Sequence, residues 1–230
     1  MQVNILSGGA AQGLVGALAP QFKAETGCDI AGTFGAVGAM RDKLLSGTPA
    51  DLLILTRALI EELTAAGHAV SGSVVDVGTV QTAVAVRDGD PSPAVGDAAA
   101  LRAVLLAAGA IYFPDPKLAT AGIHFASVLN RLGIAAEVAG RLETFPNGAT
   151  AMAALAAAAT SKPIGCTQVT EILSTPGVRL VAPLPNGYEL ATVYTAAVTG
   201  SARAPDMARR LARLLSADAA RLARTQAGFV

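Results

Sequence analysis

Short apolar runs alternate along this chain with stretches in which apolar residues recur at helical spacing. The runs "VNIL", "DIAGTF" and "ADLLILT" predict buried strands, and Leu14, Leu18 and Phe22 share one face of a helix predicted over 11–25. The pattern continues with strands at "TAVAV", "AIYF", "LETF" and "IGCTQV", separated by helices expected near 97–108, 122–132 and 149–159. Repeated strand–helix units predict an α/β protein with mostly parallel sheets and helices on both faces.

The strand–helix rhythm is interrupted twice, near residues 78–82 and 186–190. We therefore predict two lobes, one formed by residues 1–79 plus 188–230 and the other by residues 80–187, with hinges at the two interruptions. Ligands of such sheets bind beyond the carboxyl ends of the strands. The ligand cleft is expected between the lobes.

Four strand-to-helix junctions resemble one another: "SGGAA" at 7–11, "FGAVGA" at 34–39, "ATAGIH" at 119–124 and "FPNGAT" at 145–150. Each contains glycine, lacks charged residues and is predicted to begin a helix. The free N–H groups at a helix start attract anions, so four such starts could bind an anion without a buried cation. Neither a P-loop nor a G-x-G-x-x-G fingerprint is present.

Composition and residue spacing argue against several kinds of partner and site. The 230 residues are 52% apolar, and 17 Lys and Arg balance 17 Asp and Glu, so no overall charge favours nucleic acid or an anionic membrane. No apolar run approaches the roughly 20 residues of a membrane span, and no Cys/His spacing suggests a metal site. We expect a monomer with no cofactor, no metal, no nucleic-acid partner and no membrane insertion.

Two other features bear on location and on the thiols. Cys28 and Cys166 lie far apart, and Cys166 sits in an apolar run, so a free core thiol is expected at Cys166 rather than a disulfide. The first strand begins at residue 2 or 3 without a signal peptide before it. The protein is expected to be periplasmic if an export signal has been removed, and cytoplasmic if the chain is native as it stands.

The stretch "FKAETGCDIAGTFGAVGAMRDKLLSGTPADLLILT" resembles the helix–strand–GSSG–helix–GAPADV run of type 2 periplasmic solute-binding proteins, within their molybdate-binding group. "DPKLATAGIHFASVLNRLGI" is similar to the third anion loop of that group, and "LLSADAARLARTQAGF" to its closing helix. The resemblance covers nearly the whole chain. It implies the two-lobe type 2 periplasmic-binding-protein fold, with the ligand in the cleft.

Matching the family's loops to this chain, with Thr56 and the hinge-side Gln81 added for their chemistry, yields a set of expected ligand-binding residues: Ser7, Gly8, Gly9, Gly35, Ala36, Val37, Thr56, Gln81, Thr120, Ala121, Gly122, Asn147, Gly148 and Gln168. Ala36 and Val37 stand where molybdate binders usually have hydroxyls, and Gln168 stands where they have a tyrosine. Because these donors are missing, an organic di- or tricarboxylate is expected rather than molybdate.

Several functions remain open at this point. The first is a small-anion solute-binding protein, with an ABC transporter permease as partner if the chain is exported. The second is an isomerase of a small unsaturated polycarboxylate, because "IGCTQVTEI" and "AGIHFASVL" look like a subgroup with aconitate-isomerising relatives. In that case His124 is the acid–base candidate, against the alternative of a histidine packed on a neighbouring loop. A molybdate- or tungstate-binding transporter component and a detached sensory domain complete the set.

Overall fold

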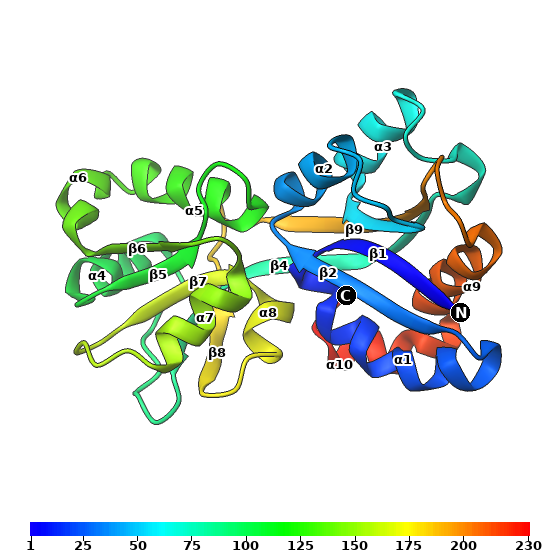
Figure 1. The fold of residues 1–230 in the computed structure, drawn as a ribbon. Coiled ribbons are helices and arrows are strands. Elements are labelled where there is room, and N and C mark those ends of the chain that lie inside the picture. The colour runs from blue at the N-terminus through cyan, green and yellow to red at the C-terminus, as the bar shows by residue number, and fades with distance from the viewer. The chain divides into compact units, whose positions relative to one another are not determined.

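The computed structural model describes residues 1–230, which form two compact units (Figure 1). Unit 1 comprises Met1–Val80 and Thr192–Val230, and unit 2 comprises Gln81–Ala191. Each unit is a β-sheet flanked by helices, which confirms the predicted α/β class. The hinges proposed near 78–82 and 186–190 stay predictions. No helix is long and apolar enough to cross a membrane.

The unit 1 sheet has the strand order β2-β1-β3-β9. Its strands are β1 (Gln2–Gly8), β2 (Asp29–Gly35), β3 (Leu52–Thr56) and β9 (Ala191–Val198). β1 is parallel to β2 and β3, whereas β9 returns antiparallel to β3. The helices of this unit are α1 (Gln12–Thr26), α2 (Val37–Leu45), α3 (Arg57–Ala65), α9 (Pro205–Ser216) and α10 (Arg221–Gln226).

Helical periodicity correctly identified the buried face of α1. Leu14, Leu18 and Phe22 are all buried, and α1 packs against α9, which buries Leu211 and Leu215. The four apolar residues of β3 are fully buried as well, as expected for a strand covered on both faces of its sheet.

Asp51 anchors the amino-terminal end of β3. Its Oδ2 accepts from the backbone N–H of Asn4 at 2.8 Å, and its Oδ1 accepts from the N–H groups of Arg203 and Ala204 at 2.7 and 2.9 Å. Burial raises the pKa of Asp51, but these hydrogen bonds outweigh burial and hold it below its usual value. The carboxylate thus joins β1, β3 and the start of α9.

The unit 2 sheet has the order β4-β7-β5-β6, with β8 also paired to β4. Its strands are β4 (Val75–Arg87), which begins in unit 1, β5 (Ile111–Pro114), β6 (Leu142–Phe145), β7 (Ile164–Gln168) and β8 (Val178–Pro183). β5 is parallel to β6 and β7, but β7 and β8 are antiparallel to β4, so this sheet is mixed. The helices are α4 (Ala98–Ala107), α5 (Thr120–Arg131), α6 (Ala135–Val138), α7 (Gly148–Ala156) and α8 (Val169–Leu173).

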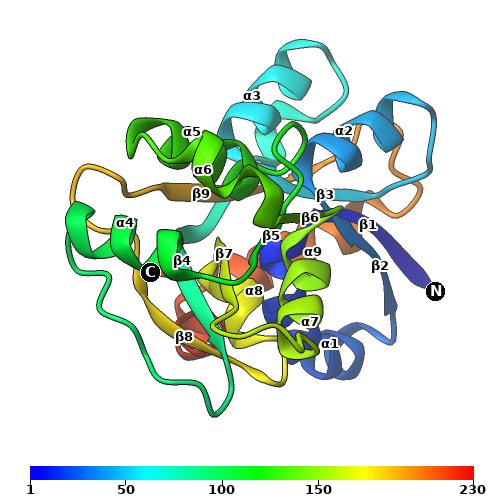
Figure 2. The same ribbon diagram turned by 90° about the vertical axis from the view of Figure 1, so that its left-hand side faces the viewer.

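The two faces of this sheet are covered by different helices (Figure 2). Phe113 and Cys166 lie in a core cluster with residues of α4 and α5, and the Phe113 and Phe125 rings meet edge to face at 5.3 Å. On the other face, a Cβ at Gly165 would lie 2.6 Å from both Met152 and Leu155 of α7. Successive residues of a strand point to opposite faces, which explains this division.

Both cysteines are free and buried, which confirms the prediction for Cys166. Burial raises the pKa of the Cys166 thiol, so it remains a packing group rather than a thiolate nucleophile.

Candidate functional site

The predicted residues of unit 1 share one sheet edge. Gly8 and Gly35 pair in register at the ends of β1 and β2, and Ser7 pairs with Ile54, two residues before the end of β3 at Thr56. Because these strands are parallel, their carboxyl ends meet at the same edge. The sheet therefore brings together Ser7–Gly9, Gly35–Val37 and Thr56.

Close packing explains part of the glycine pattern at this edge. A Cβ at Gly8 would lie 2.8 Å from both Tyr194 Cε1 and Val37 Cγ1, so any larger residue there would force one of these side chains to move. The buried Ser7 hydroxyl donates to the Gly8 carbonyl oxygen at 2.9 Å. Ala36 is the N-cap of α2 and Thr56 that of α3, and neither helix has a side-chain cap.

Tyr194 is a residue of this edge that the sequence did not reveal. It lies on β9 opposite Thr56 and is buried against Gly8. Tyr194 reaches this edge because β9 pairs antiparallel with β3. Local spacing in the sequence does not show which strands become neighbours, so it gave no signal for this residue.

A cation also adjoins this edge. Arg57, the first residue of α3, pairs with Asp76, whose Oδ1 additionally accepts from the Thr195 hydroxyl at 2.7 Å. Burial alone would raise the pKa of Asp76. The hydrogen bonds from Arg57 and Thr195 outweigh burial, so the pKa of Asp76 lies below its usual value. The Arg57 guanidinium is therefore already neutralised within the chain.

The predicted residues of unit 2 share an edge in the same way. Pro114 pairs with Phe145 at the ends of β5 and β6, and Ile111 pairs with Ile164 at the starts of β5 and β7. Because β5 has four residues and β7 has five, the three parallel strands end within one residue of one another. The segments that follow carry the predicted residues Thr120, Ala121, Gly122, Asn147, Gly148 and Gln168. Gln81 lies at the same edge, because its neighbour Thr82 pairs with Gln168 in antiparallel register.

Helix α5 begins two residues before the start predicted from sequence. Ala119 is its N-cap in an extended conformation without a side-chain cap, so Thr120 is the first helical residue. Gly122 lies inside the first turn, where a Cβ would overlap the carbonyl oxygens of Pro114 and Asp115. His124 is consequently the fifth residue of α5 and lies beyond its first turn.

His124 bonds to a backbone carbonyl. Its Nε2 lies 2.8 Å from the oxygen of Tyr188, and because a carbonyl can only accept, Nε2 carries the proton. Arg131 lies 4.5 Å above the Tyr188 ring and donates to the oxygen of Gly187. These contacts hold the 187–188 segment against α5 and leave Nδ1 as the nitrogen of His124 able to take a proton.

The start of α7 already binds a carboxylate of the chain. Asn147 caps this helix by accepting from Thr150 N at 2.9 Å. The backbone N–H groups of Gly148, Ala149 and Gln168 donate to the side chain of Glu171, and the Thr167 hydroxyl donates to its Oε2 at 2.6 Å. The Gly148 N–H that the sequence assigns to a ligand is therefore engaged internally.

Glu171 was not among the residues predicted from sequence, and it is fully buried. Burial raises its pKa, and the four donated hydrogen bonds offset that effect only in part. Its signal in the sequence is weak, because an acidic residue in the first turn of a helix is ordinarily a solvated partner of the helix dipole.

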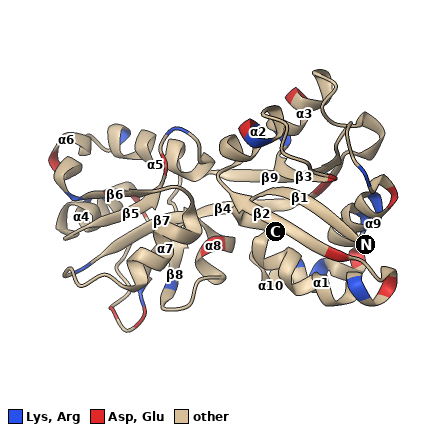
Figure 3. Cartoon of the chain, viewed as in Figure 1, with Lys and Arg blue, Asp and Glu red and all other residues tan.

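The four predicted junctions carry no Lys, Arg, Asp or Glu (Figure 3). No group of His, Cys, Asp and Glu is arranged to hold a metal ion. Backbone N–H groups and neutral side chains thus make up these four junctions.

Comparison with known proteins agrees with this architecture. The family model described as bacterial extracellular solute-binding protein matches residues 3–230. A curated aconitate isomerase from a Pseudomonas species is 27% identical over 227 residues, which covers 95% of this chain and 84% of that protein.

Solved structures share the fold. The periplasmic molybdate-binding protein of Azotobacter vinelandii matches with a TM-score of 0.82 at 20% identity, covering 99% of this chain and 98% of that one. The sulfate-binding protein of Mycobacterium tuberculosis matches with a TM-score of 0.77 at 18% identity, covering 100% and 86%. The chain therefore belongs to the bacterial extracellular solute-binding proteins and has the type 2 periplasmic-binding-protein fold of the molybdate-binding-like group.

Proposed function

We propose that this solute-binding protein takes a small organic di- or tricarboxylate. The observation that carries the proposal is that α2, α3 and α5 begin without side-chain caps at the carboxyl ends of strands, while the charged groups beside them, Arg57 and Glu171, are already bonded within the chain. The first N–H groups of a helix have no partner within it. They favour an anion there without requiring a cation.

The chemistry of the neutral side chains favours carboxylates over a tetrahedral metal oxyanion. Ala36 and Val37 supply no hydroxyl at the start of α2. Thr56, Thr120, Asn147, Gln168 and Gln81 offer hydroxyl and amide groups, which suit the carboxylates and hydroxyls of an organic acid. We include Tyr194 in the proposed site because it packs on Gly8 beside Thr56.

Titration calorimetry with two ligand sets tests the proposal. One set is cis-aconitate, trans-aconitate and citrate, and the other is molybdate, tungstate and sulfate. We expect a carboxylate to bind at least tenfold more tightly than any of the inorganic anions. Tight molybdate or tungstate binding with no response to carboxylates would instead support the metal-oxyanion component of an ABC transporter.

The relative named aconitate isomerase supports a second candidate, catalysis on the same ligand class. An isomerase must remove a proton from one carbon of an allylic acid and return one elsewhere. The helix starts would stabilise the negative charge that develops between these steps. His124 Nδ1 is the proposed proton acceptor, since Nε2 is held by the Tyr188 carbonyl.

Incubation with cis- and trans-aconitate, followed by chromatography, tests the second candidate. Turnover that is lost in His124→Ala would support it. Turnover that persists in this variant would retain the isomerase but reject His124. Binding without turnover would leave a carrier, for which we propose an ABC transporter permease as partner.

A further inference from the structure

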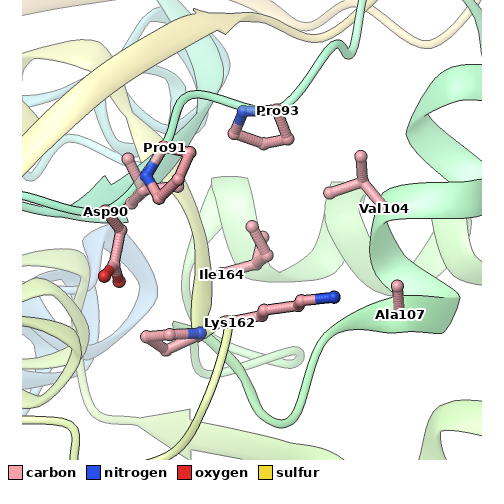
Figure 4. Close-up of a pocket in the computed structure, with 9 residues that line it drawn as sticks. Asp90, Pro91, Pro93, Val104, Ala107, Lys162 and Ile164 are labelled. Carbon is pink, nitrogen blue, oxygen red and sulfur yellow. The ribbon is translucent and has the colours of Figure 1, made fainter.

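Unit 2 contains a pocket of about 320 Å³ that none of the predicted ligand residues lines (Figure 4). Its walls come from the end of β4, the loop that follows it, helix α4 and the segment entering β7. The lining residues are Val86, Asp90, Pro91, Pro93, Val104, Ala107, Lys162, Pro163 and Ile164. The volume lies near the lower end of the roughly 300–1,000 Å³ of small-molecule sites.

The pocket lies at the opposite end of the unit 2 sheet from the predicted ligand residues. Ile164 is the first residue of β7 and Gln168 the last. At about 3.3 Å per residue, these ends are roughly 13 Å apart. One small solute cannot occupy both places.

Apolar side chains form most of the lining, and its two charged residues differ in their pairing. Asp90 Oδ1 accepts from Arg87 Nη2 at 3.0 Å, whereas its buried Oδ2 has no hydrogen-bond partner. The Lys162 side chain forms no hydrogen bond or ion pair, although its backbone carbonyl accepts from the N–H of Gly109. Its side chain crosses the pocket below Ile164 and directs the ammonium toward Ala107, away from Asp90 (Figure 4).

Two backbone features lie next to the charged residues of the pocket. Lys162 is the one non-glycine residue with a positive φ, at 50°, a conformation that is uncommon for a side chain of this kind. On the other side, Arg179 donates to the carbonyl oxygen of Asp90 and to the Ser92 hydroxyl, both at 2.6 Å. The loop is therefore held by a cation that does not line the pocket.

We propose that this pocket binds a short aliphatic monocarboxylate. Its hydrocarbon chain would pack against the proline, valine and isoleucine walls, and its carboxylate would pair with the Lys162 ammonium. Repulsion from Asp90 sets the orientation, because it keeps the carboxylate on the Lys162 side.

NMR titration of the ¹⁵N-labelled full chain with 4-methylvalerate tests the proposal. The amide signals of Val86, Val104, Ala107 and Ile164 should shift together. Two analogues separate charge from apolar contact: 4-methyl-1-pentanol, which lacks the charge, and acetate, which lacks the chain. Each should bind at least tenfold more weakly than 4-methylvalerate.

Two substitutions at exposed positions complete the experiment. Lys162→Gln should weaken binding of 4-methylvalerate at least tenfold, and Ala107→Leu should abolish it by filling the pocket. The matched control, Lys43→Gln, removes another exposed unpaired lysine and should leave binding unchanged.

The proposal is overturned if no shifts occur at millimolar ligand, or if Lys162→Gln binds as well as the unsubstituted chain. Shifts confined to Thr120, Asn147 and Gln168 would also overturn it, since they report the other end of the sheet. Because 4-methylvalerate carries one carboxylate and aconitate three, calorimetry with aconitate tests the proposed function separately.

Discussion

The backbone N–H of Gly148 donates to the carboxylate of Glu171, and a Cβ at Gly148 would overlap both that carboxylate and the Thr167 hydroxyl. A carboxylate of the chain thus occupies the helix start where the sequence predicts a ligand anion. At this junction a side chain of the protein itself accepts hydrogen bonds from the N–H groups of a helix start. We propose the same type of contact between the other helix starts and a bound carboxylate. It also makes the predictions on Gly148 and Glu171 specific.

Gly148→Ala should destabilise unit 2 by about 1–3 kcal/mol, as expected for inserting a methyl group into a packed site. Denaturant unfolding measures the change. Gly16→Ala is the matched control, because its Cβ would meet nothing within 4 Å in the middle of α1. That variant should gain about 0.5–1 kcal/mol. Equal effects of the two substitutions would contradict the Glu171–Gly148 arrangement.

Glu171→Gln should change how stability depends on pH. The pKa of Glu171 is raised in the folded state, so its contribution is complete below the unfolded value of about 4.3 and is lost as pH rises toward the folded pKa. Because glutamine does not titrate, the variant does not lose this contribution to stability as pH rises. The unfolding free energy of the glutamate protein minus that of the glutamine variant should therefore fall as pH rises from 4, and a constant value would refute this assignment.

Asp51→Asn should have the opposite pH dependence. An amide cannot accept all the N–H groups that Asn4, Arg203 and Ala204 direct at the carboxylate, so we expect a loss of roughly 2–4 kcal/mol at neutral pH. The folded pKa of Asp51 is lowered. Its contribution is therefore present above the unfolded value of about 3.9 and is lost as pH falls through the folded pKa.

Asp42→Asn is the control for Asp51. The Asp42 side chain is 53% exposed and forms an ion pair with its neighbour in sequence, Arg41. Exposed pairs contribute about 0–1 kcal/mol. Thermal and denaturant unfolding between pH 3 and 7 should separate the two variants clearly.

Thr120→Pro tests the helix start of α5 as a ligand donor. Proline is tolerated as the first helical residue and removes only that N–H, and the extended Ala119 before it suits a following proline. We expect unchanged stability and at least tenfold weaker carboxylate binding, since a hydrogen bond to a charged group contributes about 1.5–3 kcal/mol.

Two controls accompany this variant. Thr120→Ala removes the hydroxyl but keeps the N–H, and Ala98→Pro makes the same proline substitution at the start of α4, whose extended N-cap is Asp97. Neither should approach the loss in Thr120→Pro. If all three variants bind alike, the N–H of Thr120 is not a ligand contact.

Local pattern determined much of this protein. The spacing of Leu14, Leu18 and Phe22 identified the buried face of α1, and the glycine-bearing junctions identified the starts of helices at the carboxyl ends of parallel strands. These features depend on periodicity and on turn residues within a few positions of one another. They can therefore be read along the chain.

Only the tertiary structure decided which groups meet at those junctions. Tyr194 reaches Gly8 because β9 returns antiparallel to β3, and His124 bonds to the Tyr188 carbonyl across 64 positions of sequence. Glu171 is near in sequence to Thr167, but the donors from Gly148 and Ala149 come from another strand–helix unit. Such pairings depend on strand order and on burial, and residue spacing along the chain specifies neither.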